Sequence, residues 1–150
     1  MNELSYSLVT NINSNTVSVI DGITNKIIAN IDTGKVPYGM ALNPITKKVT
    51  NLLSNTVSVI DEIANRIIAN LTVGWNPIGI TVNPTTNKIY ATDYSSNSLS
   101  VLDGSRSKVI DTIPVGRNPV EIAVYRKGTQ CHADAGRGYE FSSWSKIAFG

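Results

Sequence analysis

Residues 15–30 read NTVSVIDGITNKIIAN, and residues 55–70 read NTVSVIDEIANRIIAN. The two copies lie 40 positions apart and differ at three of their sixteen positions. A looser third copy, NSLSVLDGSRSKVIDT, occupies residues 97–112. Repetition at a fixed period indicates a repeat architecture, in which each copy is one supersecondary unit that packs against its neighbours.

Single residues mark the same places in every copy. An Asp, a Gly and a Pro recur at spacings of 40 and then 42 positions: Asp21, Asp61 and Asp103; Gly34, Gly74 and Gly116; Pro37, Pro77 and Pro119. A fourth, partial copy begins at Pro119 and fades after Tyr125. A period of ~40–45 residues is the length of four short strands with their turns, as in one blade of a β-propeller.

Local signals favour strands over helices within each unit. Val, Ile and Thr dominate the repeated segments, and these β-branched residues favour strands. Apolar residues do not recur at a sustained helical spacing, and turn residues return at intervals of roughly 8–12 positions. We therefore predict an all-β fold of β-propeller type, with about three four-stranded antiparallel blades that form an open arc or part of a larger ring.

The predicted units span about residues 6–37, 38–77 and 78–119, followed by a partial unit at 120–125. In this division residues 1–125 form the repeat domain and residues 126–150 form a tail. The chain begins at a second strand, and residues 120–125 are predicted to be the first strand of a further blade. Other expected strands cover residues 6–10, 38–42, 56–60, 66–71 and 88–92.

Turn residues carry two structural predictions. The repeated Asp is expected to accept hydrogen bonds from the amides of its own hairpin turn. Gly74 is expected to let the chain cross into the next unit by adopting a positive φ angle, which glycine tolerates.

The second unit is two residues shorter than the third, and we assign the loss to its second strand. That strand lacks a counterpart of Tyr90. Because two is an even number, the alternation of side chains between the two faces survives. We expect the blade of residues 38–71 to be the loosest of the three.

Several spaced elements agree between the units: VTN at residues 9–11, then NTVSVID, then KIIANI, then a Gly followed by a Pro three positions on, then NPxTxK. Together they resemble the YVTN β-propeller repeat family over residues 6–125. The full tetrapeptide is absent, because the three units read LVTN, KVTN and YATD at this place. The resemblance implies a propeller fold and an extracytoplasmic or cell-surface location, and it implies no single activity.

Composition narrows the function classes. The formal net charge is +2, and the Lys and Arg residues are scattered, so the basic stripe of a nucleic-acid-binding protein is absent. No apolar run is long enough to span a bilayer. Residues 1–8 lack the basic and apolar regions of a signal peptide. The single cysteine, Cys131, allows no internal disulfide.

The segment 126–150 departs from the repeat in composition. It holds the only His, the only Cys and both Phe residues of the chain. Three explanations stay open: a C-terminal extension, part of a neighbouring domain, or readout from a shifted frame, which the abrupt change favours. Cys131, His132 and Asp134 match no standard zinc spacing. We expect this tail to pack poorly and to carry an incidental thiol.

Catalytic motifs are missing from the sequence. A residue present in every unit serves the blade, so a catalytic residue should break the repeat, and the carboxylates that do so show no pairing. No nucleophile elbow, phosphate-binding Gly loop or HExxH motif occurs. We predict no catalytic residue, no metal site and no cofactor, and we lean away from an enzyme.

The loops that join one unit to the next vary most. Loops 33–37, 73–77 and 115–119 keep their Gly and Pro and differ between them. Such loops gather on one face of a propeller, and loops on a rigid scaffold carry recognition. We predict a binding site at their tips: Lys35, Trp75, Asn76, Arg117 and Asn118. For Trp75 two roles stay open, an interface hot spot or a cover over the neighbouring blade.

These observations favour a non-enzymatic scaffold or binding module for a protein or surface component. A fragment of a propeller enzyme, lactonase-like or quinone-dependent oxidoreductase-like, is the second hypothesis and rests on fold analogy alone. A gene remnant without independent function is the third. Open blade edges also predict association into a homo-oligomer.

Overall fold

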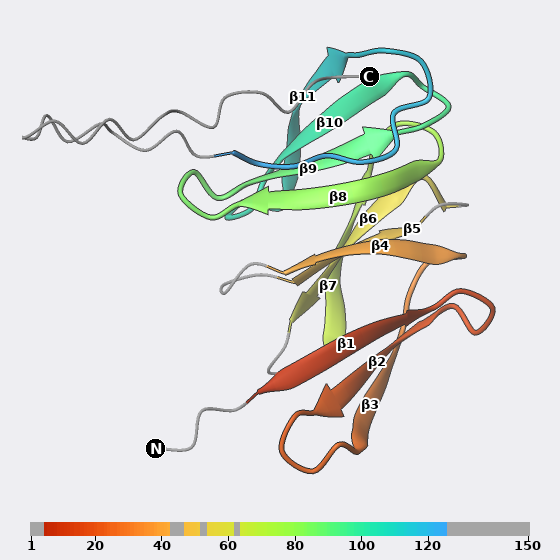
Figure 1. The fold of residues 1–150 in the computed structure, drawn as a ribbon, viewed down its shortest axis with the longest axis vertical. Coiled ribbons are helices and arrows are strands. Elements are labelled where there is room, and N and C mark those ends of the chain that lie inside the picture. Colours follow the sequence, from red (N-terminus) through yellow and green to blue (C-terminus); the bar gives the residue numbers. More distant parts are fainter. Residues whose placement is uncertain (1–4, 43–46, 52–53, 62–63, 126–150) are drawn as a thin grey trace, which may run out of the picture.

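The computed structural model describes residues 5–42, 47–51, 54–61 and 64–125, and for residues 47–51 it describes the backbone alone. Within these ranges eleven strands form three antiparallel sheets (Figure 1). Blade 1 holds β1 (Tyr6–Asn11), β2 (Thr16–Asp21) and β3 (Ile27–Asp32). Blade 2 holds β4 (Pro37–Leu42), β5 (Lys47–Asn51), β6 (Thr56–Asp61) and β7 (Arg66–Thr72). Blade 3 holds β8 (Pro77–Asn83), β9 (Lys88–Asp93), β10 (Ser98–Asp103) and β11 (Lys108–Pro114).

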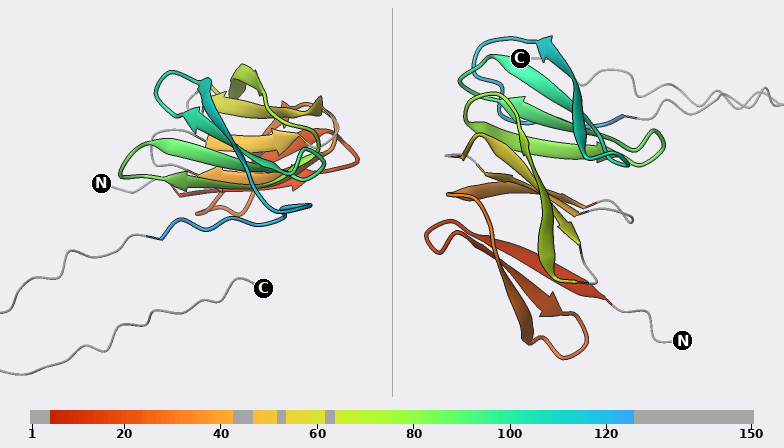
Figure 2. Two further views of the ribbon diagram at one scale, coloured as in Figure 1. Left: turned by 90° about the horizontal axis from the view of Figure 1, so that it is seen from above. Right: turned by 180° about the vertical axis from the view of Figure 1, so that it is seen from behind.

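The three blades stack side by side into an open arc (Figures 1 and 2). Strands follow one another within each sheet in chain order, and the inner strands β4 and β8 lie beside each other. Blade 1 begins at the equivalent of a second strand, so its three strands match β5–β7 and β9–β11. The prediction of an all-β, propeller-type arc of about three blades is confirmed.

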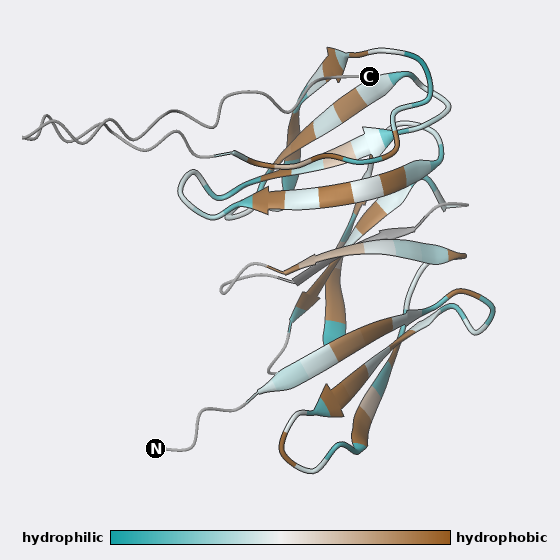
Figure 3. Cartoon of the chain, viewed as in Figure 1, coloured by the Kyte–Doolittle hydropathy of each residue, from teal (hydrophilic) through white to brown (hydrophobic). Residues whose placement is uncertain are grey.

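Apolar side chains fill the junctions between blades. One cluster joins Val17, Val19 and Ile31 of blade 1 to Ile60 of blade 2. A second cluster joins Val57 of blade 2 to buried residues of blade 3: Ile89, Ala91 and Leu102. The alternation of apolar and polar residues along the strands gives each blade these apolar faces (Figure 3). Each blade is therefore stabilised by its neighbours rather than by a core of its own.

The hairpin turns confirm the prediction for the repeated Asp. Asp21 Oδ1 accepts from the Ile23 and Thr24 amides at 2.8 Å, and Asp103 Oδ1 accepts from the Ser105 amide at 2.8 Å. Ser107 closes the turn of Asp103 at positive φ, and Asn residues do so in the other described turns: Asn15, Asn25, Asn55, Asn65, Asn87 and Asn97. Asn tolerates this left-handed conformation better than other non-glycine residues, which explains why it recurs at the end of the turns.

The prediction of a positive φ at Gly74 is wrong. No described glycine has a positive φ, and the left-handed residue of each crossover is Val36, Asn76 or Asn118. Gly74 is needed for space instead, because a Cβ atom there would lie 2.5 Å from the Asp93 Cγ atom. The crossover thus requires a glycine for close packing against the following blade.

The prediction of a strand at residues 120–125 is also wrong. These residues are described and form no strand. They run alongside β8, and the Val120 carbonyl accepts a hydrogen bond of 2.9 Å from the Thr92 hydroxyl (Figures 1 and 2). The segment follows the path of an inner strand, but no described strand pairs with it.

Strand pairing locates the shortfall of the second unit. Val49 pairs with Met40 in blade 2 as Ala91 pairs with Ile80 in blade 3. Lys48 therefore takes the register of Tyr90, and β5 is one residue shorter than β9. The assignment of the whole loss to the second strand is wrong, because β4 is also one residue shorter than β8, and Lys48 occupies the position of Tyr90. The looseness of the blade stays a prediction. The division into domains also stays a prediction, and those for 126–150 lie outside the described residues.

Candidate binding face

The crossover loops gather on one face of the arc, together with the hairpin turns that precede β2, β6 and β10 (Figure 1). We call this the crossover face and define it by residues 33–36, 73–76 and 115–118 with turn residues 12–15, 54–55 and 94–97. The opposite face carries the turns of the repeated Asp. The tips of the crossover loops vary in sequence from blade to blade, whereas the turns of the opposite face keep the repeated Asp.

Each crossover loop is held by the blade that precedes it. The Asn15 Oδ1 atom accepts from the Val36 amide at 3.0 Å, and Asn55 Oδ1 accepts from the Asn76 amide at 3.0 Å. Asn97 does the same for the Asn118 amide at 2.9 Å. Because the same bond recurs in all three loops, the loop conformation is set by the repeat.

The following blade holds the first two loops a second time. The Ser54 hydroxyl accepts from the Lys35 amide at 2.8 Å, and the Ser96 hydroxyl accepts from the Trp75 amide at 2.7 Å. Arg117 has no following blade in the described residues to provide a third hydroxyl. The tips of the first two loops are thus fixed from both sides, which prepares their side chains for contact at little entropic cost.

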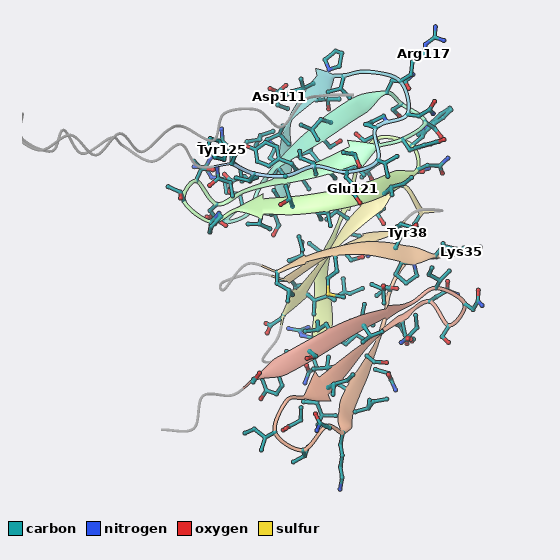
Figure 4. The ribbon with its side chains drawn as sticks, in the orientation of Figure 1. Lys35, Tyr38, Asp111, Arg117, Glu121 and Tyr125 are labelled. Carbon is teal, nitrogen blue, oxygen red and sulfur yellow. The ribbon has the colours of Figure 1, made fainter. Side chains whose placement is uncertain are left out.

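The five predicted residues divide into two groups. Lys35, Trp75 and Arg117 are exposed, and the Trp75 side chain is 68% exposed. Lys35 and Arg117 project from the same side of the arc (Figure 4). Asn76 is half-buried and Asn118 is exposed, and both side chains turn toward the hairpin of blade 3, where they donate to the Ser95 hydroxyl at 2.7 Å and the Tyr94 carbonyl at 3.3 Å.

The sequence reasoning missed one buried polar residue beneath this face. Asp93 is fully buried, and its Oδ2 atom accepts from the Ser100 and Ser98 hydroxyls at 2.7 and 3.1 Å. Its Oδ1 atom has no hydrogen-bond partner. Burial raises the pKa of Asp93 above its ordinary value, against the opposing effect of the two serine hydroxyls. This carboxyl keeps its proton to a higher pH than an exposed aspartate does.

The sequence did hold a signal for Asp93. The equivalent residue of blade 1 is Asn11, whose amide donates to the Ser18 hydroxyl at 2.8 Å. Ser18 then donates to Asn30 at 2.7 Å, so the chain of bonds runs outward across blade 1. In blade 3 the equivalent serine donates inward to Asp93, which reverses the direction. The change from Asn to Asp in the third copy marks this reversal.

The aspartates on the opposite face accept hydrogen bonds from amides of their own hairpin turns. The Thr24 and Ile23 amides lower the pKa of Asp21, and the Arg106 and Ser105 amides do the same for the pKa of Asp103. In the part of the chain that the structure describes, no group of three or more His, Cys, Asp or Glu could hold a metal ion. Within the same residues no helix is long and apolar enough to cross a membrane.

Solved structures that share this fold include the following three. Hydrazine synthase from Kuenenia stuttgartiensis matches with a TM-score of 0.74 and 24% identity, over 78% of this chain and 35% of that chain. Dihydro-heme d1 dehydrogenase NirN, in complex with DHE, matches with a TM-score of 0.68 and 18% identity, over 75% of this chain and 25% of that chain. Apo AztD from Citrobacter koseri matches with a TM-score of 0.67 and 20% identity, over 80% of this chain and 34% of that chain. The chain spans between a quarter and about a third of these structures.

No protein-family model matches the chain, and no curated protein matches its sequence. The likeness to the solved structures is a likeness of propeller fold, and two of them are named for different activities, a synthase and a dehydrogenase. The fold type is therefore established, whereas the function has to be argued from the chain's own surface.

Proposed function

We propose that this chain is a non-enzymatic binding module whose crossover face recognises an acidic segment of another protein. One observation carries the proposal: three equivalent loop positions present exposed Lys35, Trp75 and Arg117 side chains in a row. Trp and Arg are enriched among the residues that dominate interface energetics. A cation on each side of an aromatic ring suits a chain that carries carboxylates between apolar groups.

The rigidity of the loops supports this role. Holding the Lys35 and Trp75 amides between two blades leaves only side-chain freedom to be lost on binding. Asn76 and Asn118 contribute by fixing the loops through their own hydrogen bonds. The five predicted residues thus act as three contacts and two supports.

Poly-L-glutamate tests the proposal as a defined acidic polypeptide. The chain has two Trp residues, so a Trp144→Phe background makes Trp75 the only tryptophan. Titration is expected to shift the Trp75 fluorescence, with an affinity that falls as salt screens the charges. Replacing both Lys35 and Arg117 by Ala should remove the shift.

The matched control is Lys26→Ala, since Lys26 is an exposed cation in a turn of the opposite face. That variant should bind as the parent does. A chain that does not respond to the polymer, or a double variant that binds as tightly as the parent, would refute the proposed face.

We also propose membership of the YVTN repeat family and a surface or exported setting. The spaced motifs of residues 6–125 support both. Detection of the chain in an extracytoplasmic fraction of its source cells would support the setting, and strict retention in the cytosol would refute it.

A fragment of a propeller enzyme is the second proposed function. Two of the similar structures are named as enzymes, a synthase and a dehydrogenase. A substrate or metal that stabilises this chain would raise its melting temperature through binding to the folded state. Turnover by the chain would replace the binding-module proposal.

A further inference from the structure

The two ends of the arc expose the two halves of a blade junction. Ile31 of blade 1 is 4% exposed because blade 2 covers it, whereas the equivalent Ile113 of blade 3 is 41% exposed. At the other end, Val9 of blade 1 is 45% exposed, whereas the equivalent Ala91 is fully buried against blade 2. The open flank of blade 3 therefore resembles the leading half of a junction, and that of blade 1 resembles the receiving half.

Segment 120–125 occupies the path of the next inner strand. The Thr10 hydroxyl of blade 1 donates to the Tyr38 carbonyl of the following inner strand at 3.3 Å. The equivalent Thr92 of blade 3 donates to the Val120 carbonyl at 2.9 Å. Val120 therefore lies where the second residue of a further blade's inner strand belongs, whereas blade 1 has no inner strand among its described residues.

We propose that two copies of this chain associate head to tail, with segment 120–125 of each copy pairing as the missing inner strand of blade 1 in the other. The register follows from β8 and β9, where Ile80 pairs with Ala91. The equivalent pair joins Ile122 of one copy to Val9 of the other. Blade 1 of one copy then covers the open flank of blade 3 in the other.

Two polar positions fit the same arrangement. A Cβ atom on Gly74 would meet Asp93 of the following blade, whereas a Cβ atom on Gly116 meets nothing within 4 Å. The second copy would bring Asn11, the equivalent of Asp93, into that space. Ser14 of the second copy stands at the position of Ser54 and Ser96, so its hydroxyl is placed to accept from the Arg117 amide as they accept in the other loops.

The number of blades in a closed propeller ring determines how many copies of the chain associate. The contact is heterologous, so it produces either a closed ring or an open filament. Two copies with three described blades each give a ring of six, inside the usual range of ~4–8 blades. The exposed apolar residues of both flanks would be buried in the two equivalent contacts.

Glu121 weakens this contact. It stands at the position of Gly79, where a Cβ atom would lie within 3.0 Å of the Thr92 hydroxyl and would also meet the next inner strand. In the two-copy ring the Glu121 side chain must find room beside the Thr10 hydroxyl of the other copy. Replacing Glu121 by Gly is therefore expected to tighten the association by about tenfold or more.

Sedimentation velocity over a dilution series tests the proposal on the full chain. The parent and Glu121→Gly should move from one to two chain masses as concentration rises, with the variant doing so at lower concentration. Gly116→Leu should stay a single chain and keep its melting temperature in dilute solution, because the open space at Gly116 is needed only by the second copy. The matched control Arg117→Leu should still associate.

Two further variants distinguish the head-to-tail contact from a symmetric one. Val9→Asp and Ile113→Asp should each lose association alone, whereas their mixture should recover a pair through the one contact that remains intact. A Val9→Asp variant that still dimerises would overturn the proposal. Single chains at all concentrations for both the parent and Glu121→Gly, or a mass above two chains, would overturn it as well.

Discussion

The junction between blades 2 and 3 and the open flank of blade 3 are built from the same repeated positions in different surroundings. Gly74 lies against the buried Asp93, whereas Gly116 faces open space. Val73 packs in the cluster of that junction, whereas the equivalent Val115 is 42% exposed. The repeat therefore specifies the path of the backbone, and the presence of the following blade decides whether a side chain is buried.

The largest expected difference in unfolding free energy is between the Ala variants of Ile31 and Ile113. Ile31→Ala removes a side chain covered by blade 2 and should cost ~2–5 kcal/mol of unfolding free energy through lost burial and a cavity. Ile113→Ala removes a half-exposed side chain and should cost ~1 kcal/mol. Urea unfolding of both variants, in dilute solution, measures the difference. Equal costs would show that the outer strand of blade 3 is covered in the single chain.

Gly74 and Gly116 give the next contrast. Gly74→Ala should lose ~1–3 kcal/mol, because the new methyl group overlaps the buried Asp93 side chain. Gly116→Ala should stay within about 0.5 kcal/mol of the parent. Thermal unfolding of the two variants decides it. A harmless Gly74→Ala would mean that the two blades separate easily.

Asp93 provides a pH-dependent comparison with Asn11. Because the pKa of Asp93 is raised in the folded state, the protonated carboxyl is favoured by folding. Its contribution is fully present below the pKa of the unfolded aspartate and is lost as pH rises through the raised pKa. Asp93→Asn should therefore be the more stable protein at neutral pH, by ~1 kcal/mol, and should lose this advantage in acid.

A double variant sharpens that test. Thr112 stands where Asn30 accepts from Ser18 in blade 1. Asp93→Asn combined with Thr112→Asn should rebuild the outward chain of hydrogen bonds and exceed the single variant in stability. Denaturant unfolding at several pH values is the measurement, and an Asp93→Asn variant that is less stable at neutral pH contradicts the account.

The smallest effect concerns the left-handed residue of the crossovers. Val36 has a φ of 55°, which is unfavourable for a β-branched side chain, whereas the equivalents Asn76 and Asn118 tolerate it. Val36→Asn should stabilise the chain by ~0.5–1 kcal/mol. The reverse change, Asn76→Val, should destabilise it. Calorimetric melting of both variants tests the pair, and a loss of stability in Val36→Asn would refute this reading.

Sequence periodicity was sufficient for the fold because every landmark of the repeat is a local requirement. The Asp turns, the strand pattern and the crossover positions follow from residues close in the chain. Environments set by a neighbouring blade could not be predicted in this way. The need for Gly74, the burial of Asp93 and the unpaired path of residues 120–125 all depend on contacts between residues distant in sequence.

Prediction of the binding face from the sequence was limited in the same way. Loop variability located Lys35, Trp75 and Arg117, because exposed tips are free to vary. It did not separate them from Asn76 and Asn118, whose side chains bond to the turn of blade 3. That distinction needed the positive φ angles and the hydrogen-bond partners, which no single-residue pattern contains.

Amide hydrogen exchange, followed by NMR in the Val9→Asp variant, tests most directly whether the following blade sets the environment of a repeated position. The Lys35 and Trp75 amides bond to hydroxyls of the following blade, whereas no blade follows Arg117 in the part of the chain that the structure describes. We predict slow exchange at Lys35 and Trp75 and fast exchange at Arg117. The Val36, Asn76 and Asn118 amides, bonded to their own blades, should be protected alike. Protection of Arg117 equal to that of Trp75 would contradict this prediction.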